Sequence, residues 1–139
     1  MSYDIYLFDP TTRNVIQLDE KHDLRGGTYV VGGSTTAELN VTYNYSGHYR
    51  RVFEPVPANE DSKQFADNDG MVHGIRTLYG MTALRSIPII NNAIRQLGDD
   101  EHPDYWNATE GNARAALINL LILATHASTV NVNATWGGD

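Results

Sequence analysis

The segment from Thr42 to Arg51, TYNYSGHYRR, gathers side chains that are well suited to binding a ligand. Aromatic rings can stack on a flat ring, and guanidinium groups can hold an anion through paired hydrogen bonds. The candidate ligand-binding residues in this segment are Tyr43, Asn44, Tyr45, His48, Arg50 and Arg51. This combination is typical of a site for a small, flat, anionic ligand of the nucleotide type.

A second interpretation of the same segment needs no ligand. As a β-strand, it places Tyr43 and Tyr45 on one face, and tyrosines often pair across strands on half-buried sheets. A bend at Ser46–Gly47 would leave His48 and Arg50 together on one side. Both interpretations remain open at the level of sequence.

Four further candidates for the binding site lie later in the chain. Tyr79 is the middle residue of the sequence LYG at residues 78–80, and Arg76 comes two residues before this sequence. Tyr105 and Trp106 are adjacent to each other. No nucleophile motif such as G-x-S-x-G and no zinc motif H-E-x-x-H is present. We therefore predict no catalytic residue, no metal and no cofactor.

A glycine-rich run, GGTYVVGGST at residues 26–35, resembles a phosphate-binding loop only superficially. In such a loop a lysine follows the second glycine, whereas this chain has Gly33 there. The flanking residues are β-branched and aromatic, so the Gly32–Gly33 pair predicts a hairpin turn instead.

The acidic segment GDDEHPDYW at residues 98–106 could supply oxygen ligands to a metal. It lacks converging ligands from elsewhere in the chain, and its acids also suit the N-terminus of a following helix. We therefore interpret it as a solvated loop between helices.

Composition limits the classes of function. The chain has 139 residues, a net charge of -7 and no cysteine. The negative charge argues against non-specific binding of nucleic acid, which requires a basic surface. No basic signal-peptide segment opens the chain, and the apolar run at residues 116–124 is too short to span a bilayer, so we expect a cytoplasmic protein.

The elements that must position these residues form an α+β fold. Strand patterns fill residues 1–53, with alternation over residues 3–9 and a return strand at residues 15–18. Residues 54–73 form a polar loop or insertion. Helical patterns fill residues 82–128. We expect a single domain in which an N-terminal antiparallel sheet packs against C-terminal helices.

The two expected helices have recognisable starts. Ser86 is the expected cap of the first, with Pro88 in its first turn, and Thr109 is the expected cap of the second. The second helix is apolar nearly all round, so we expect its inner residues to be buried. Those residues are Leu117, Leu120, Leu121 and Ala124.

Most of the sequence outside residues 54–73 resembles a family of small, uncharacterised proteins encoded by bacteriophages and prophages. The resemblance is carried by the segments GGTY, TYNY, HYRR, LYGM, SIP, LGDD, DYW and TEGNA. The family has no established activity, so it implies a phage origin and an accessory role but transfers no catalytic residue. The ending, ATWGGD, departs from the Trp-Asp-Gly-Asp type of tail in the family.

These observations support three hypotheses about function. The first is a phage accessory protein that binds a small anionic nucleotide-type ligand, for example as an anti-defence sponge that sequesters a host immune signal. The second is a protein–protein inhibitor of a host defence protein that acts through an acidic surface. The third is a small hydrolase or phosphodiesterase. We also expect a homo-oligomer, because a short sheet leaves unpaired strand edges.

Overall fold

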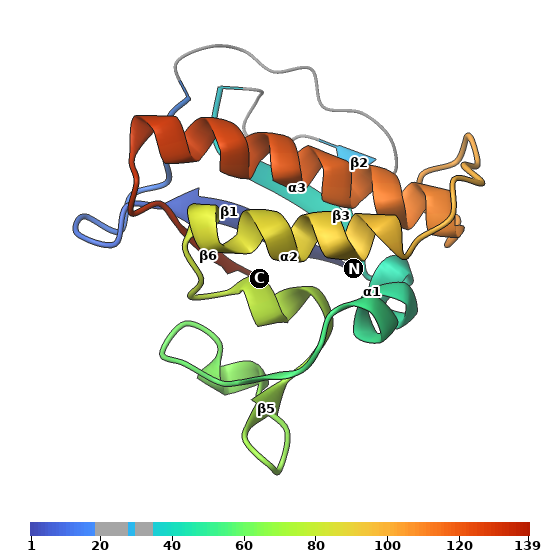
Figure 1. Cartoon of the computed structure of the whole chain (residues 1–139), viewed down its shortest axis with the longest axis horizontal. Helices are drawn as coiled ribbons and strands as arrows, with labels where there is room; N and C mark the ends of the chain where they lie inside the picture. Colours follow the sequence, from blue (N-terminus) through green and yellow to red (C-terminus); the bar gives the residue numbers. More distant parts are fainter. Residues whose placement is uncertain (19–27, 30–34) are drawn as a thin grey trace.

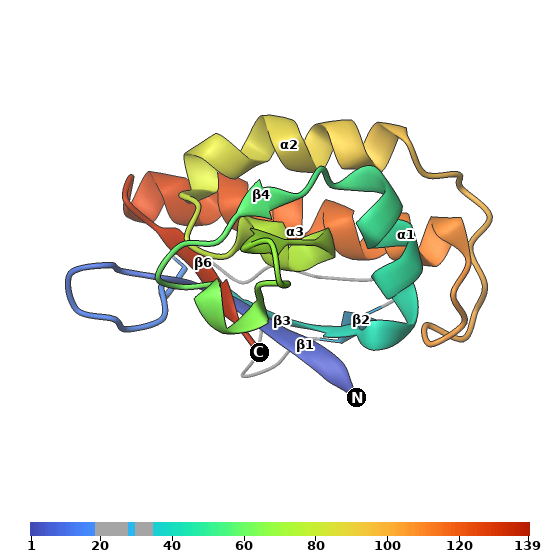
Figure 2. The same cartoon turned by 90° about the horizontal axis from the view of Figure 1, so that it is seen from below.

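The computed structural model describes residues 1–18, 28–29 and 35–139. Antiparallel strands from the N-terminal part form a sheet, and the long helices α2 and α3 lie side by side over one of its faces (Figures 1 and 2). The predicted α+β fold is therefore confirmed.

The main sheet has the strand order β2-β3-β1-β6. Its strands are β1 (Ser2–Phe8), β2 (Thr28–Tyr29), β3 (Glu38–Thr42) and β6 (Thr135–Gly138), and all the pairings are antiparallel. Alternation in β1 sends Tyr3, Ile5 and Leu7 into the core. Ile5 pairs with Leu39 of β3, so the apolar faces of the two central strands coincide.

Residues 15–18 form a return segment that is less regular than the predicted strand. They make only isolated bridges, from Val15 to Phe8 and from Gln17 to Thr36. The turn before them has Arg13 at a φ of 66°, which tightens the chain reversal. The predicted hairpin turn at Gly32–Gly33 lies outside the described residues.

The largest correction concerns residues 43–52, which are helical and not a strand. A short 3₁₀ turn (Tyr43–Tyr45) leads into α1 (Ser46–Val52). The hydroxyl of Thr42 accepts a hydrogen bond from the Asn44 backbone N–H, which caps the start of the turn. Tyr45 and Tyr49 stand four residues apart and are both fully buried, so the aromatic spacing fits a helix that faces the core.

Helix α2 (Ala83–Arg95) begins three residues before the expected cap at Ser86. Thr82 is the actual cap, since its hydroxyl accepts from the Arg85 N–H. Ser86 is buried within the helix, where its hydroxyl donates to the Ala83 carbonyl and accepts from the indole N–H of Trp136. Pro88 therefore lies inside the helix and not in its first turn.

Helix α3 (Glu110–Val130) begins as predicted, with Thr109 accepting from the Asn112 N–H. Leu117, Leu120 and Ala124 are fully buried, as expected, whereas Leu121 is only partly buried where it packs against the core. This helix is long and apolar enough to cross a membrane by length and composition alone. Half of its most apolar window is buried inside the protein, which is what a core helix shows.

The polar segment at residues 54–73 is folded rather than a plain loop. It contains β4 (Val56–Pro57), a 3₁₀ turn (Lys63–Phe65) and β5 (Met71–Val72), and β4 pairs with β5. A further 3₁₀ helix (Gly74–Leu78) connects it to the core beneath α2 (Figure 1).

Strand β6 is not a free edge. On its outer side Gly80 donates to the Trp136 carbonyl, Trp136 donates to Met81, and Ala83 donates to Ala134. The segment before α2 thus closes this side of the sheet. The unpaired edge that motivated the expectation of an oligomer is absent here.

Candidate ligand-binding site

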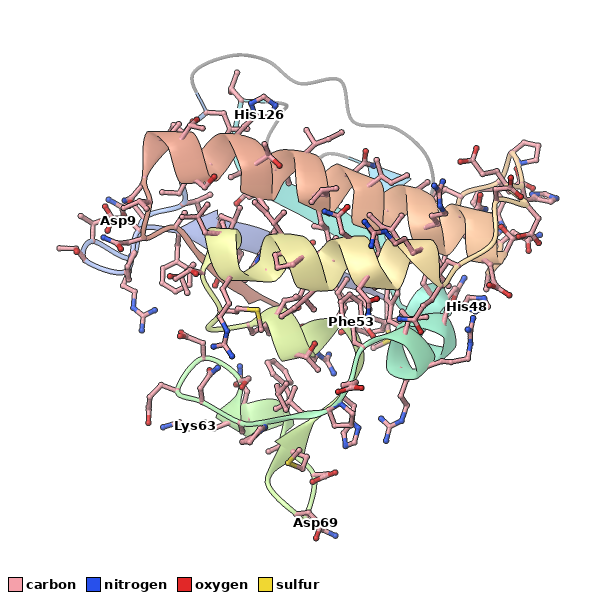
Figure 3. All side chains as sticks on the ribbon, viewed as in Figure 1. Asp9, His48, Phe53, Lys63, Asp69 and His126 are labelled. Atoms are coloured by element: carbon pink, nitrogen blue, oxygen red, sulfur yellow. The ribbon has the colours of Figure 1, made fainter. Side chains whose placement is uncertain are left out.

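Three predicted site residues hold the loop at residues 98–109 against the start of α1. The Asn44 side-chain amide donates to the Trp106 carbonyl at 2.6 Å, and the Tyr45 hydroxyl donates to the Tyr105 carbonyl. His48, which projects from α1 toward this loop (Figure 3), contacts the Ala108 carbonyl through Nε2 at 2.8 Å. Because a carbonyl only accepts, Nε2 of His48 carries the proton.

The same loop is held from its other side by the first turn of α3. Asn112, only 2% exposed, accepts from the His102 backbone N–H and donates to the carbonyls of Asp104 and Asn107. The Asp100 carboxylate accepts from the Gly111 N–H. These contacts fix the loop on both flanks, so its tip is presented by a rigid support.

The tip of this loop exposes two aromatic side chains. Tyr105 is 37% exposed and Trp106 is 53% exposed, and their rings meet edge to face with centroids 5.4 Å apart. Elsewhere most large aromatic rings of the described chain are buried in the core. Exposed aromatic rings on a well-held loop are a common feature of binding surfaces.

Both rings line a pocket of about 330 Å³ at the end of the sheet. The pocket lies between this loop and the ends of β1 and β3, and we call it the Trp106 pocket. Its lining consists of Met1, Ser2, Asn40, Thr42, Asn44, Tyr105 and Trp106. Among the residues that the structure describes, no Lys, Arg, Asp or Glu side chain is in this lining.

The hydrogen-bonding groups of the two pocket asparagines have fixed orientations. Asn40, 5% exposed, donates through Nδ2 to Ser2 Oγ at 2.7 Å and to the Asp4 carboxylate at 2.6 Å. Since a carboxylate only accepts, the nitrogen must face Asp4. Among the described residues the side-chain oxygens of Asn40 and Asn44 have no donor, so the pocket offers two free acceptors.

A second group of predicted site residues lies on the opposite, inner face of the sheet end. Arg76 binds the Asp139 carboxylate through Nε at 3.1 Å and Nη2 at 2.5 Å. The buried Tyr79 hydroxyl donates to the same carboxylate at 2.9 Å. Burial, followed by the Asp139 charge, raises the pKa of Tyr79 well above its usual value, so this hydroxyl stays protonated and donates.

The two arginines of α1 do not join the Trp106 pocket. Arg51 points along the helix to Glu110 at the start of α3, with Nη2 3.4 Å from the carboxylate. Arg50 is exposed and is not in the pocket lining. The ten predicted site residues thus fall into three groups. Five support or line the pocket: Asn44, Tyr45, His48, Tyr105 and Trp106. Tyr43, Arg76 and Tyr79 surround Asp139, and Arg50 and Arg51 lie outside both groups.

Several residues of these sites were not among the sequence-based candidates. Ser2, Asn40 and Thr42 line the pocket because they occupy alternate positions on the outer face of β1 and β3. The sequence showed that polar residues lie on the face of β1 opposite its apolar face. It did not show the β1–β3 register, which places Ser2 opposite Thr42 and Asp4 opposite Asn40. Asp139 gave no signal, since only the fold brings it to Arg76.

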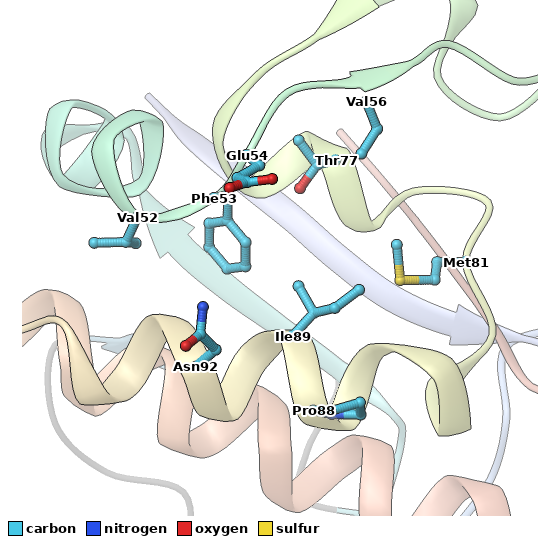
Figure 4. Close-up of a pocket in the computed structure, with 9 residues that line it drawn as sticks. All are labelled: Val52, Phe53, Glu54, Val56, Thr77, Met81, Pro88, Ile89 and Asn92. Carbon is cyan, nitrogen blue, oxygen red and sulfur yellow. The ribbon is translucent and has the colours of Figure 1, made fainter.

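A separate apolar hollow of about 330 Å³ lies between α2 and the chain after α1 (Figure 4). Phe53, Met81 and Ile89 contribute to its walls, together with Val52, Val56 and Pro88. None of the ten predicted site residues lines it.

The acidic loop at residues 98–106 carries the carboxylates that were considered as metal ligands. Within residues 1–18 and 35–139, no group of three or more His, Asp or Glu side chains is arranged to hold an ion. The loop's Asp100 is engaged with the start of α3, which agrees with the interpretation as an interhelix loop.

Comparison with known proteins identifies no relative. No protein-family model matches the chain, and no curated protein and no solved structure matches it.

Proposed function

We propose that the protein binds a small, ring-containing polar ligand of the nucleotide type in the Trp106 pocket. The observation that carries this proposal is the exposure of Tyr105 and Trp106 over a pocket whose two asparagine side-chain oxygens have no donor among the described residues. A nucleobase stacked on an exposed aromatic side chain gains roughly 1–3 kcal/mol. The support of the loop by Asn44, Tyr45 and Asn112 reduces the entropy lost on binding.

The polar groups of the pocket favour a ligand that is rich in donors. The free oxygens of Asn40 and Asn44 accept hydrogen bonds, and the hydroxyls of Ser2 and Thr42 can donate or accept. Exocyclic amino groups of bases and ribose hydroxyls match this pattern. The described lining contains no lysine or arginine side chain, so we place the base and sugar in the pocket and the phosphates toward solvent.

We further propose that the protein is a phage accessory protein that acts as a sponge and removes a host immune signal from the cytosol. The phage-type resemblance of the sequence supports this setting. A sponge needs tight binding without chemistry, and the described residues of the pocket lining include no pair of side chains arranged as nucleophile and base.

Depletion of ligands from a defined mixture tests this function. The protein is incubated with a panel of cyclic and ADP-ribose-type nucleotides, separated by filtration and denatured, and the released material is analysed by chromatography. We expect one nucleotide to be depleted from the filtrate and recovered unaltered from the protein. Recovery of a cleaved product would replace this function with the hydrolase hypothesis.

A second candidate function is inhibition of a host defence protein through a protein–protein contact. Tyr105 and Trp106 belong to residue types that dominate interface energetics, and acidic residues surround them on the same loop. If no nucleotide is depleted, this function becomes the leading one. It then predicts that Trp106→Ala abolishes capture of a host protein.

A further inference from the structure

The Asp139 carboxylate occupies a set of groups that resembles a receptor for a small anion. The Arg76 guanidinium presents two N–H groups to the two carboxylate oxygens, at 3.1 Å and 2.5 Å. The Tyr79 hydroxyl donates to one oxygen at 2.9 Å, and the Tyr43 hydroxyl makes a longer contact of 3.4 Å to the other. Paired contacts of this kind are the usual way in which arginine recognises a carboxylate or phosphate.

The receptor groups are positioned independently of Asp139. Aromatic rings surround the Arg76 guanidinium, with its central carbon 4.4 Å from the Phe65 ring centroid, 5.1 Å from Tyr3 and 5.7 Å from Tyr43. Tyr79 is fully buried in the core. Because packing holds these groups, they keep their geometry when the carboxylate leaves.

Asp139 is held to the rest of the protein by its carboxylate contacts and by one backbone hydrogen bond. Its side chain is 16% exposed, and its φ of 81° is a conformation that a non-glycine residue seldom adopts. It follows Gly137 and Gly138, which lack side chains, and one backbone hydrogen bond, to the Asp4 carbonyl, joins it to β1. The Arg76 side chain remains 28% exposed, so solvent ions can reach it.

We propose that Arg76, Tyr79 and Tyr43 form a binding site for a carboxylate or phosphate group, and that Asp139 is a built-in occupant of this site. An external anion binds when the Asp139 side chain is displaced. This site lies apart from the Trp106 pocket and shares none of its lining residues, so it does not depend on the function proposed for that pocket.

The substitution Asp139→Gly empties the proposed site without straining the backbone, since glycine accepts a positive φ. The thermal midpoint of this variant is measured in sodium acetate, sodium phosphate and sodium chloride at equal ionic strength. Asp139→Gly should have a lower thermal midpoint than wild type in chloride. We expect acetate or phosphate to raise this midpoint in a saturable manner, and to restore roughly half or more of the difference from wild type at about 100 mM anion. Chloride should have no comparable effect, and wild type should respond much less.

Two controls make the test specific. In Asp139→Gly/Arg76→Gln the guanidinium is absent, so the effect of acetate and phosphate must disappear. In Asp139→Asn an amide fills the site, so the response must be smaller than in Asp139→Gly. A response limited to acetate assigns a carboxylate site, and one limited to phosphate assigns a phosphate site.

Equal midpoints of Asp139→Gly in all three salts, or an unchanged response after removal of Arg76, would overturn the proposal. If Asp139→Gly is unfolded in chloride, its circular dichroism is compared in the three salts. Refolding in acetate or phosphate alone supports the site, and failure to refold in any salt contradicts it.

Discussion

At the scale of single residues, Asn112 has the most influence on the geometry of the Trp106 pocket. Its buried side chain makes three hydrogen bonds to the backbone of the loop that carries Tyr105 and Trp106. Asn112→Ala would leave these backbone groups to water or unpaired. We expect a loss of about 1–3 kcal/mol in the free energy of unfolding, measured by urea denaturation. A loss below about 0.5 kcal/mol would show that the loop holds its shape without Asn112.

Three buried tyrosines predict a loss of stability at alkaline pH. Burial, as the main cause, raises the pKa of Tyr45, Tyr49 and Tyr79 above the usual value near 10. The unfolded chain therefore loses these protons first as the pH rises. The stability they contribute is complete below about pH 10 and falls above it, by up to about 1.4 kcal/mol per pH unit for each tyrosine.

Urea denaturation at a series of pH values between about 8 and 11 measures this effect. Tyr79→Phe should reduce the slope above pH 10, because it removes one of the three groups. A free energy of unfolding that stays constant across this range would contradict the burial of these hydroxyls.

Several residues that sequence reasoning selected for ligand binding also make contacts within the protein. Asn44, Tyr45 and His48 were chosen as ligand-binding side chains, and they bind the protein's own loop. Residue type alone cannot distinguish these roles, since an amide or a hydroxyl binds a backbone carbonyl as readily as a ligand. The distinction requires knowing that residues some 60 positions later lie beside α1.

At the scale of elements, the junction between the acidic loop and α3 depends on a glycine. A Cβ atom at Gly111 would lie 2.5 Å from the Glu101 nitrogen and 2.6 Å from the Asp100 carbonyl carbon. Gly111→Ala should therefore cost roughly 1–3 kcal/mol of stability and displace the loop, although alanine is the better helix former.

Gly47→Ala in α1 is the matched control. No atom lies within 4 Å of a Cβ placed there, so alanine should raise stability by about 0.4–1 kcal/mol. Urea denaturation of both variants checks the contrast. Equal effects of the two substitutions would contradict the close packing of the loop on α3.

The elements that the sequence predicted well are those with a strong local signal. The alternation in β1 and the Thr109 cap of α3 each have one physical cause, which is readable over a few residues. The segment at residues 43–52 was assigned as a strand because tyrosine favours both strands and buried helix faces. Its helical spacing, with Tyr45 and Tyr49 four positions apart, was the signal that should have decided the assignment.

At the scale of the whole molecule, the oligomeric state remains a prediction. The segment at residues 80–83 closes the β6 side of the sheet, whereas β2 stands at the other end of the strand order. We expect the homo-oligomer to form through β2 or through exposed apolar residues such as Val130 and Val132. Light scattering at micromolar concentration should give a multiple of the 15.4 kDa chain mass. A mass equal to one chain would show that it is a monomer.

The central claim, that the Trp106 pocket binds a nucleotide-type ligand, is tested most directly by a dissociation constant. Isothermal titration with the nucleotide that the protein depletes is carried out on wild type, on Trp106→Ala and on Leu84→Ala. Leu84 is an exposed apolar residue on α2 outside the pocket lining, so it controls for non-specific effects. We predict binding weakened roughly 10- to 100-fold by Trp106→Ala and unchanged by Leu84→Ala, because Trp106 stacks on the ligand's ring and Leu84 lies outside the pocket lining. Equal dissociation constants for wild type and Trp106→Ala would contradict the claim.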